Sequence, residues 1–315
     1  MGWLWDNIIQ PLLNALGTAI GGVVDWILSN TLGVPLRALL KSLAQTGVDI
    51  YNTFVQDAVD VLTQDPTTIA NGQLWSVIEP INSALVAVGS MLVVLFFLID
   101  FCSSSLDVRD NVRLETIFKT SIKLIIAEYF VTNNITVIKG LIAIGDGIVD
   151  IIAGSSSATK VTLSQTFLNS VDKYDFWTTL LGVIIWLIVA LAMIGSGAII
   201  MYYAYQRAIK LLVIVPFGAI AFSTIAGGHQ INHTTISFVK FVLATMLEAG
   251  AIIIVLILMG KLISVGGIGS ISTTQAFASD ISGALKAGVS YALSCLLTVG
   301  MVKGCLSTIE RGLGL

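Results

Sequence analysis

A stretch of thirty-one residues, 176–206, carries no charged side chain. As a helix, residues 177–203 are roughly 40 Å long, which is enough to cross a hydrocarbon core of about 30 Å with some tilt. Trp177 lies at one end of this segment and three tyrosines lie at the other. Aromatic rings favour both interfaces of a bilayer, so the pattern predicts a membrane-spanning helix.

Two cations, Arg207 and Lys210, separate this span from a second apolar run, residues 211–226. The spacing predicts a membrane hairpin, with both cations at its turn. Pro216 and Gly218 are expected to kink the second helix, because proline lacks the N–H that a helix interior uses.

The composition agrees with the membrane class. Of the 315 residues, 56% are hydrophobic and 11% are charged, whereas soluble domains carry about 25% charged residues. The net charge of −3 argues against bulk electrostatic capture of nucleic acid. The three cysteines form no CxxC pair, so we interpret them as small packing residues.

The chain divides into three regions: an amphipathic helical region over residues 1–80, a transmembrane domain over 81–303, and a short tail over 304–315. Apolar residues recur at helical spacing over 5–27 and again over 35–62, with polar residues on the opposite faces. Such helices lie in a membrane interface or form part of a bundle with one wet face.

An all-α polytopic fold with about five to six transmembrane helices is therefore expected. Segment 117–152 contains charged residues and is either one crossing, broken near residues 132–134, or a re-entrant hairpin; the single crossing is preferred. Loop 154–175 is expected to contain a short helix, and residues 264–280 are rich in glycine and serine. The expected spans are 81–99, 117–152, 177–203, 211–226, 238–259 and 284–302.

Lysine and arginine in short loops predict the orientation, because they accumulate on the cytoplasmic side. The hairpin and the single crossing place all the basic loop residues on one side, which leaves the N-terminal region and loop 154–175 outside. The predicted cytoplasmic residues are Arg109, Arg113, Lys119, Lys123, Arg207 and Lys210.

Glu248 lies near the middle of the fifth span. An ionisable group at that depth is costly unless it faces protein or water, so Glu248 either lines a pore or proton path or is hydrogen-bonded between helices. Glu128 likewise either lines a pore or proton path or is hydrogen-bonded between helices. Lys240 lies eight residues before Glu248, about 12 Å along the helix axis, and is not expected to pair with it directly.

We expect no catalytic, metal or cofactor site. No HExxH, P-loop or dinucleotide-binding pattern is present. His229 and His233 have the spacing of two helical metal ligands, but the preceding glycine pair favours a turn and no third ligand is evident.

The layout resembles the TrbL family, the polytopic channel subunit of bacterial type IV secretion and conjugation machines. The resemblance covers residues 81–302 and extends to the amphipathic N-terminal region. Its carriers are the basic segment 107–123, the polar loop 154–175, the hairpin with Arg207 and Lys210 at its turn, and the glycine-rich connection 264–280. Some members have a large central external loop for substrate contact, and this chain offers only 154–175 there.

The resemblance implies an inner-membrane subunit without a catalytic site. It would be a homo-oligomer in the lipid bilayer and would assemble with the machine's ATPases and bitopic scaffold proteins to pass single-stranded DNA with its relaxase, or protein. Two other classes stay open. One is a secondary transporter with Glu248 as a midplane carboxylate, although no internal repeat is found. The other is a membrane scaffold that does not conduct.

Overall fold

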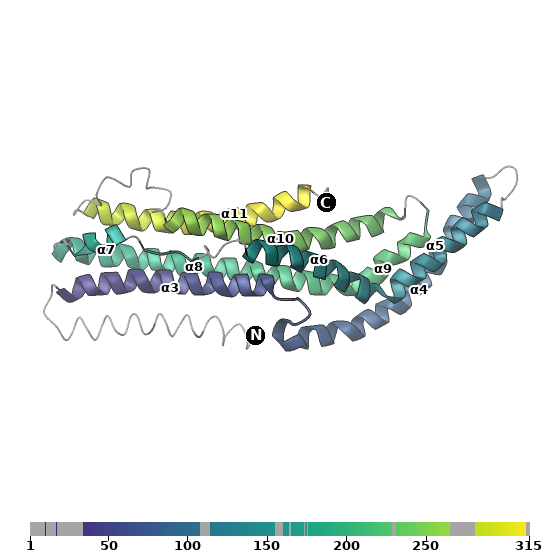
Figure 1. Ribbon diagram of the computed structural model, residues 1–315, viewed down its shortest axis with the longest axis horizontal. Coiled ribbons are helices and arrows are strands. Elements are labelled where there is room, and N and C mark those ends of the chain that lie inside the picture. The colour runs from purple at the N-terminus through teal and green to yellow at the C-terminus, as the bar shows by residue number, and fades with distance from the viewer. Residues whose placement is uncertain are drawn as a thin grey trace. The chain divides into compact units, whose positions relative to one another are not determined.

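The computed structural model describes residues 10, 17, 34–107, 114–154, 160–163, 165–172, 174, 176–228, 231–264 and 281–312. Within these ranges every secondary-structure element is a helix (Figure 1), so the predicted all-α class is confirmed there. The elements are α3 (Val34–Thr63), η2 (Ile69–Gly72), α4 (Gln73–Asp107), α5 (Leu114–Thr132), α6 (Asn134–Gly154), α7 (Gln165–Val171), α8 (Phe176–Ile214), η3 (Val215–Phe217), α9 (Gly218–Ser223), η4 (Thr224–Ala226), α10 (His233–Ser264) and α11 (Ile281–Gly312).

Helix α3 has the amphipathic pattern that its sequence predicts. Polar side chains on its outer face join across one turn, Gln45 with Asp49 and Gln56 with Asp60. These pairs stabilise the exposed side of the helix, while burial of the apolar side drives its packing. The buried residues of the predicted apolar face are Leu36, Leu40, Tyr51, Phe54, Ala58 and Leu62.

The chain forms two compact units, and the first comprises Met1–Val55, Ala158–Ile199 and Leu258–Val299. Helix α8 packs closely on its neighbours here through glycines. A Cβ on Gly182 would lie 3.2 Å from Leu40 of α3, and one on Gly288 of α11 would lie 3.1 Å from Val189. Trp186 of α8 lies against the rings of Phe167 and Tyr291. Small residues therefore allow the helices to approach, and buried aromatic rings fill the space beside them.

The second unit comprises Gln56–Ser157, Ile200–Ile257 and Gly300–Leu315. In it, α5 and the beginning of α6 run antiparallel to α4. Four contacts show this register, because rising residue numbers in α5 and α6 meet falling numbers in α4. They are Lys123 with Asp100 (3.1 Å), Glu128 with Ser90 (2.8 Å), Asn134 with Asn82 (2.8 Å), and Lys139 Nζ over the Trp75 ring (4.7 Å to the centroid).

The predicted break in segment 117–152 is found at Asn133, between α5 and α6. The Asn133 N–H donates to the Tyr129 carbonyl and the Asn133 carbonyl accepts from the Val137 N–H, both at 3.0 Å. The helical bonding therefore continues across the break. Figure 1 shows α6 leading onward from α5 instead of folding back along it, so the structure shows a broken helix and not a re-entrant hairpin.

The predicted hairpin between residues 177–203 and 211–226 is wrong. Helix α8 is continuous from Phe176 to Ile214, so Arg207 and Lys210 lie within a helix and not in a turn. Its 39 residues rise about 58 Å. Helix α8 ends at Ile214, and Pro216 lies in the 3-10 turn η3 that follows it, so the proline interrupts the α-helix where a kink was expected. Gly218 has helical backbone angles and begins α9.

Four helices among the described residues are long and apolar enough to cross a membrane. Segment 117–152 is not one of them, and one candidate replaces the two predicted spans of the hairpin. The four are Ile69–Ser103, Thr179–Ala226, His233–Ile263 and Gly288–Ile309. The predicted short helix in loop 154–175 is α7. The amphipathic helix expected over 5–27 and the connection 264–280 lie outside the described residues, apart from residues 10, 17 and 264.

Candidate functional site

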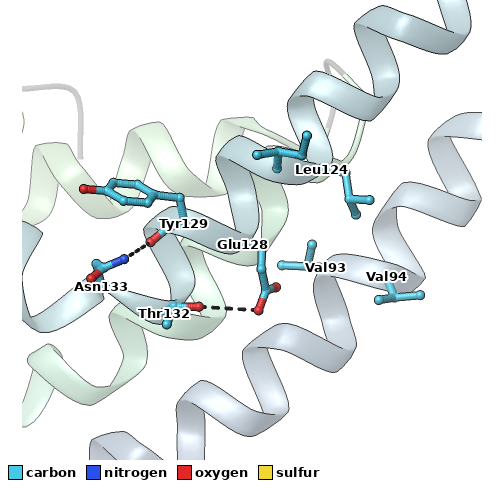
Figure 2. A pocket seen from close by; sticks show the side chains of 8 residues that line it. Val93, Val94, Leu124, Glu128, Tyr129, Thr132 and Asn133 are labelled. Carbon is cyan, nitrogen blue, oxygen red and sulfur yellow. Dashed lines mark hydrogen bonds between the residues drawn. The ribbon is translucent and has the colours of Figure 1, made fainter.

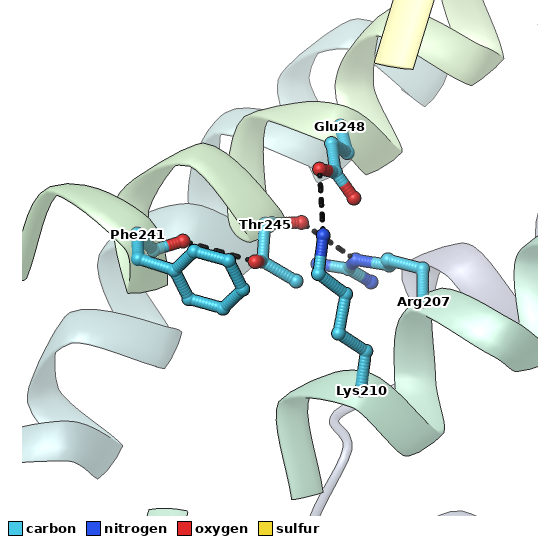
Figure 3. Close-up of polar contacts among 5 residues, drawn as sticks. All are labelled: Arg207, Lys210, Phe241, Thr245 and Glu248. Carbon is cyan, nitrogen blue, oxygen red and sulfur yellow. Dashed lines mark hydrogen bonds and ion pairs between the residues drawn. The ribbon is translucent and has the colours of Figure 1, made fainter. Parts of the chain in front are cut away.

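Helices α8 and α10 bring polar side chains together inside the second unit (Figure 3). Arg207 and Lys210 are three residues apart on α8, and Thr245 and Glu248 are three apart on α10. Residues at this spacing share one face of a helix. Each helix therefore presents two polar residues on one face.

Arg207 is 3% exposed. Its Nε donates to the Thr245 carbonyl at 3.0 Å and one terminal nitrogen donates to the Leu62 carbonyl at 3.4 Å. The other terminal nitrogen lies 3.4 Å from the sulfur of Met246. Arginine offers five N–H donors in a rigid fork, so it can bind groups from several elements at once. Here it joins α8 to the end of α3 and to α10.

Glu248 forms an ion pair with Lys210, with Oε1 and Nζ 3.3 Å apart. The Glu248 side chain is 4% exposed and that of Lys210 is 31% exposed. The Lys210 ammonium also lies over the ring of Phe241, 4.8 Å from its centroid. An intramembrane carboxylate needs such compensation, because an uncompensated charge is costly in hydrocarbon.

A second carboxylate, on Asp146 of α6, completes the charge balance. Both Asp146 and Glu248 interact electrostatically with Arg207. Oδ1 of Asp146 is buried and has no hydrogen-bond partner among the described atoms. We call Asp146, Arg207, Lys210 and Glu248 the charge cluster. It contains two cations and two carboxylates, and it joins α6, α8 and α10 within one unit.

Glu128 lies in a different place, an open groove between α4 and α5 of about 530 Å³. Figure 2 shows its carboxylate pointing toward α4 beside Val93. Ser90 donates to Oε1 at 2.8 Å and Thr132 donates to the same oxygen at 3.4 Å. Apolar side chains line the remainder of the groove, together with Tyr129, Thr132 and Asn133.

The other predicted site residues are dispersed. Lys240 is exposed on α10, and the ion-pair partner of Glu248 is Lys210 instead. Lys119 and Lys123 belong to helix α5 and not to a loop, and Lys123 pairs with Asp100. Arg109 and Arg113 lie outside the described residues. Arg207 and Lys210, expected in a cytoplasmic loop, belong to the charge cluster.

His229 lies outside the described residues, so the pair with His233 is not placed. His233 is exposed at the start of α10, with Nδ1 3.2 Å from the Ser237 hydroxyl. Among the described residues, no group of three His, Cys, Asp or Glu side chains has an arrangement that could hold a metal ion.

Sequence reasoning identified Glu248 but missed its partners. Asp146 was not among the predicted site residues, and Arg207 was expected in the turn of a hairpin. The sequence did contain a signal for such partners. Two cations three residues apart on an apolar helix share one face, and their charges need carboxylates or other acceptors nearby. The partner helix could not be identified in this way, since contacts between distant segments have no local pattern.

The helices and the charge cluster define an all-α protein of the membrane class, with four candidate spans in its described part. The sequence matches no protein-family model and no curated protein, and its fold matches no solved structure.

Proposed function

We propose that the protein is a channel or scaffold subunit of a bacterial type IV secretion machine, as the resemblance to the TrbL family implies. It lies in the inner membrane with its N-terminal region outside the cytoplasm. It assembles with further copies of itself, with ATPases and with bitopic scaffold proteins, and it helps to pass a DNA–relaxase complex or protein across the membrane.

The supporting observation is the exposed apolar surface of α4. Only 11% of the most apolar window of this candidate span is buried, against 61% for α10. A helix that is apolar on nearly every side and so little covered by its own chain has surface left for lipid and for other subunits. A subunit of a larger membrane assembly needs such a surface.

Five crossings fit this function and the fold of the second unit. The path α5–α6 retraces α4 through the four antiparallel contacts, so if α4 crosses the membrane, α5–α6 crosses it back. With the three later candidate spans, the chain crosses five times. The connection 108–113, with Arg109 and Arg113, is then cytoplasmic by the positive-inside rule, and loop 154–175 is external. This proposal replaces the hairpin that formed part of the resemblance.

The test is DNA transfer in the bacterium that carries the gene. Deleting the gene should lower conjugation frequency by several orders of magnitude, and the full-length chain supplied on a plasmid should restore it. A deletion strain that transfers DNA at the normal frequency contradicts the proposal.

A secondary transporter is the second candidate, and the charge cluster is the observation that favours it. Transporters place ionisable groups at the membrane midplane, and Glu248 is buried, pairs with Lys210 and interacts electrostatically with Arg207. A transporter predicts that Glu248→Gln abolishes solute uptake by proteoliposomes while the protein stays folded. The secretion subunit predicts that this variant, when folded, still supports DNA transfer.

A further inference from the structure

We infer that copies of this chain join through Glu128 of one copy and Lys240 of the next, with the groove between α4 and α5 receiving the exposed face of α10. This inference rests on the self-assembly in the proposed function and names the surface that carries it. The occupant of the groove is a second copy of this chain.

The first half of the contact is the groove around Glu128. Within the described residues, the hydrogen-bond partners of its carboxylate are two hydroxyl groups, on Ser90 and Thr132, and no cation lies within 4.0 Å of it. The groove is open, and Ile125 and Tyr129 on its rim are more than 60% exposed. A negative charge thus lies in an apolar surface on a helix that borders a candidate span.

The second half is the outward stripe of α10. Lys240 is exposed, with Ile236 one turn before it and Leu247 two turns after it, also exposed. Of the described carboxylates, none forms an ion pair with Lys240. The stripe is therefore apolar with one cation, which is complementary to an apolar groove with one carboxylate.

The two charges lie close to one cluster of aromatic rings in the second unit. Phe222 contacts Phe130 of α5 and Phe238 of α10, each with ring centroids 5.7 Å apart. Glu128 is two residues before Phe130 and Lys240 is two residues after Phe238. Each residue is therefore about 3 Å along its helix from this cluster, and the long side chain of a lysine can reach across a small difference in height.

This shared neighbourhood matters because the copies of a ring are related by rotation about the membrane normal, and that rotation preserves depth. A contact between two different surfaces is heterologous, and such contacts close into a ring when the rotation permits. In a ring, Lys240 of each copy contacts Glu128 of one neighbour, and Glu128 of that copy contacts Lys240 of the other neighbour. Both charges are then compensated in hydrocarbon, where an unpaired charge is costly, and the lysine stem covers apolar groove surface.

Two chains that each carry one new cysteine test the contact. Cys102→Ser and Cys305→Ser remove the two native thiols that are not buried, and Cys295 is retained because it is buried. Glu128→Cys with one tag and Lys240→Cys with another are co-expressed and treated in membranes with a short bifunctional methanethiosulfonate. The expected result is a cross-linked dimer that carries both tags. Because each chain has one new thiol, a bond within one copy cannot produce it.

The matched control replaces Lys240→Cys by Lys261→Cys, an exposed position on the same helix about 31 Å further along its axis. Its yield of mixed dimer should be at least several-fold lower. If both cysteine pairs give equal yields of cross-linked dimer while the two tags are still purified together, the chain self-associates through another surface. That result overturns this contact and leaves the proposed function standing. The two results can also separate in the other direction. If the Glu128→Cys and Lys240→Cys chains cross-link strongly but deletion of the gene leaves DNA transfer normal, the contact is supported and the proposed function is overturned.

Charge exchange provides a second measurement. Glu128→Lys and Lys240→Glu should each lower recovery of one tag with the other by several-fold, and the double variant should restore it. Failure of the double variant to restore association, when it reaches the membrane in normal amount, contradicts the pairing and indicates that Lys240 extends to lipid headgroups instead.

Discussion

At the scale of single residues, the charge cluster shows how an apolar interior accommodates ions. Arg207 donates to two backbone carbonyls and interacts electrostatically with two carboxylates, so its charge and several of its donors have partners. A buried ion pair contributes little net stability, but removing one member leaves the other uncompensated. The cluster therefore fixes which faces of α6, α8 and α10 meet.

The Lys210–Glu248 pair should show this coupling directly. Glu248→Gln should lower the free energy of unfolding by about 2–4 kcal/mol, because it leaves two buried or half-buried cations with one carboxylate. Lys210→Met should also destabilise, and the double variant should lose clearly less than the sum of the two. Unfolding by denaturant titration in detergent micelles measures all three.

Lys261→Met is the matched control, because Lys261 is an exposed lysine on α10. Its effect should stay within about 0.5 kcal/mol. Additive losses at Lys210 and Glu248 would show that the two side chains do not interact in the folded protein.

At the scale of helices, close approach depends on particular glycines. A Cβ on Gly89 of α4 would lie 2.9 Å from the carbonyl oxygen of Ala219 in α9, which is backbone and cannot turn aside. A Cβ on Gly147 of α6 would meet nothing within 4 Å. Comparing alanine variants at these two positions therefore distinguishes the packing role of glycine from its effect on helix propensity.

Gly89→Ala should destabilise the protein by about 1–3 kcal/mol, since α4 and α9 must move apart. Gly147→Ala should be neutral or stabilising by up to about 1 kcal/mol, because alanine favours a helix over glycine. Thermal unfolding of both variants in the same detergent measures the difference. A stabilising Gly89→Ala would mean that α4 and α9 are not in contact.

Local sequence patterns correctly predicted several features of the helices but wrongly predicted a hairpin turn. The buried face of α3, the break at Asn133 and the end of α8 near Pro216 each follow from periodicity or from a residue that disfavours helix. The hairpin turn was inferred from charge alone. Residues 203–210 contain no glycine, proline, asparagine or aspartate, so they lack turn formers and consist mainly of residues that a helix accommodates.

The candidate site was predicted less completely than the helices. Glu248 was identified by its depth in an apolar segment, which is a local property. Its partners come from α8 and, through Arg207, from α6, and those contacts depend on how the helices pack. The groove at Glu128 likewise exists only where α4 and α5 meet.

At the scale of the whole molecule, two features support the proposed order of crossings. Helix α8 continues through Arg207, so residues 179–226 form one candidate span and not two. A Cβ on Gly228 would lie 2.9 Å from Asp100 Oδ1, so the end of that span lies beside the end of α4. The proposed five-crossing arrangement therefore has these two helix ends on the same side of the membrane.

Cysteine accessibility on the two sides of the membrane tests this order most directly. Lys160 and His233 are exposed and flank the span 179–226, and each is replaced by cysteine in the background that lacks Cys102 and Cys305. With one crossing between them, an impermeant maleimide should label Lys160→Cys in intact cells and His233→Cys only in inverted vesicles. Labelling of both positions from the same side would restore the hairpin and contradict the five-crossing arrangement.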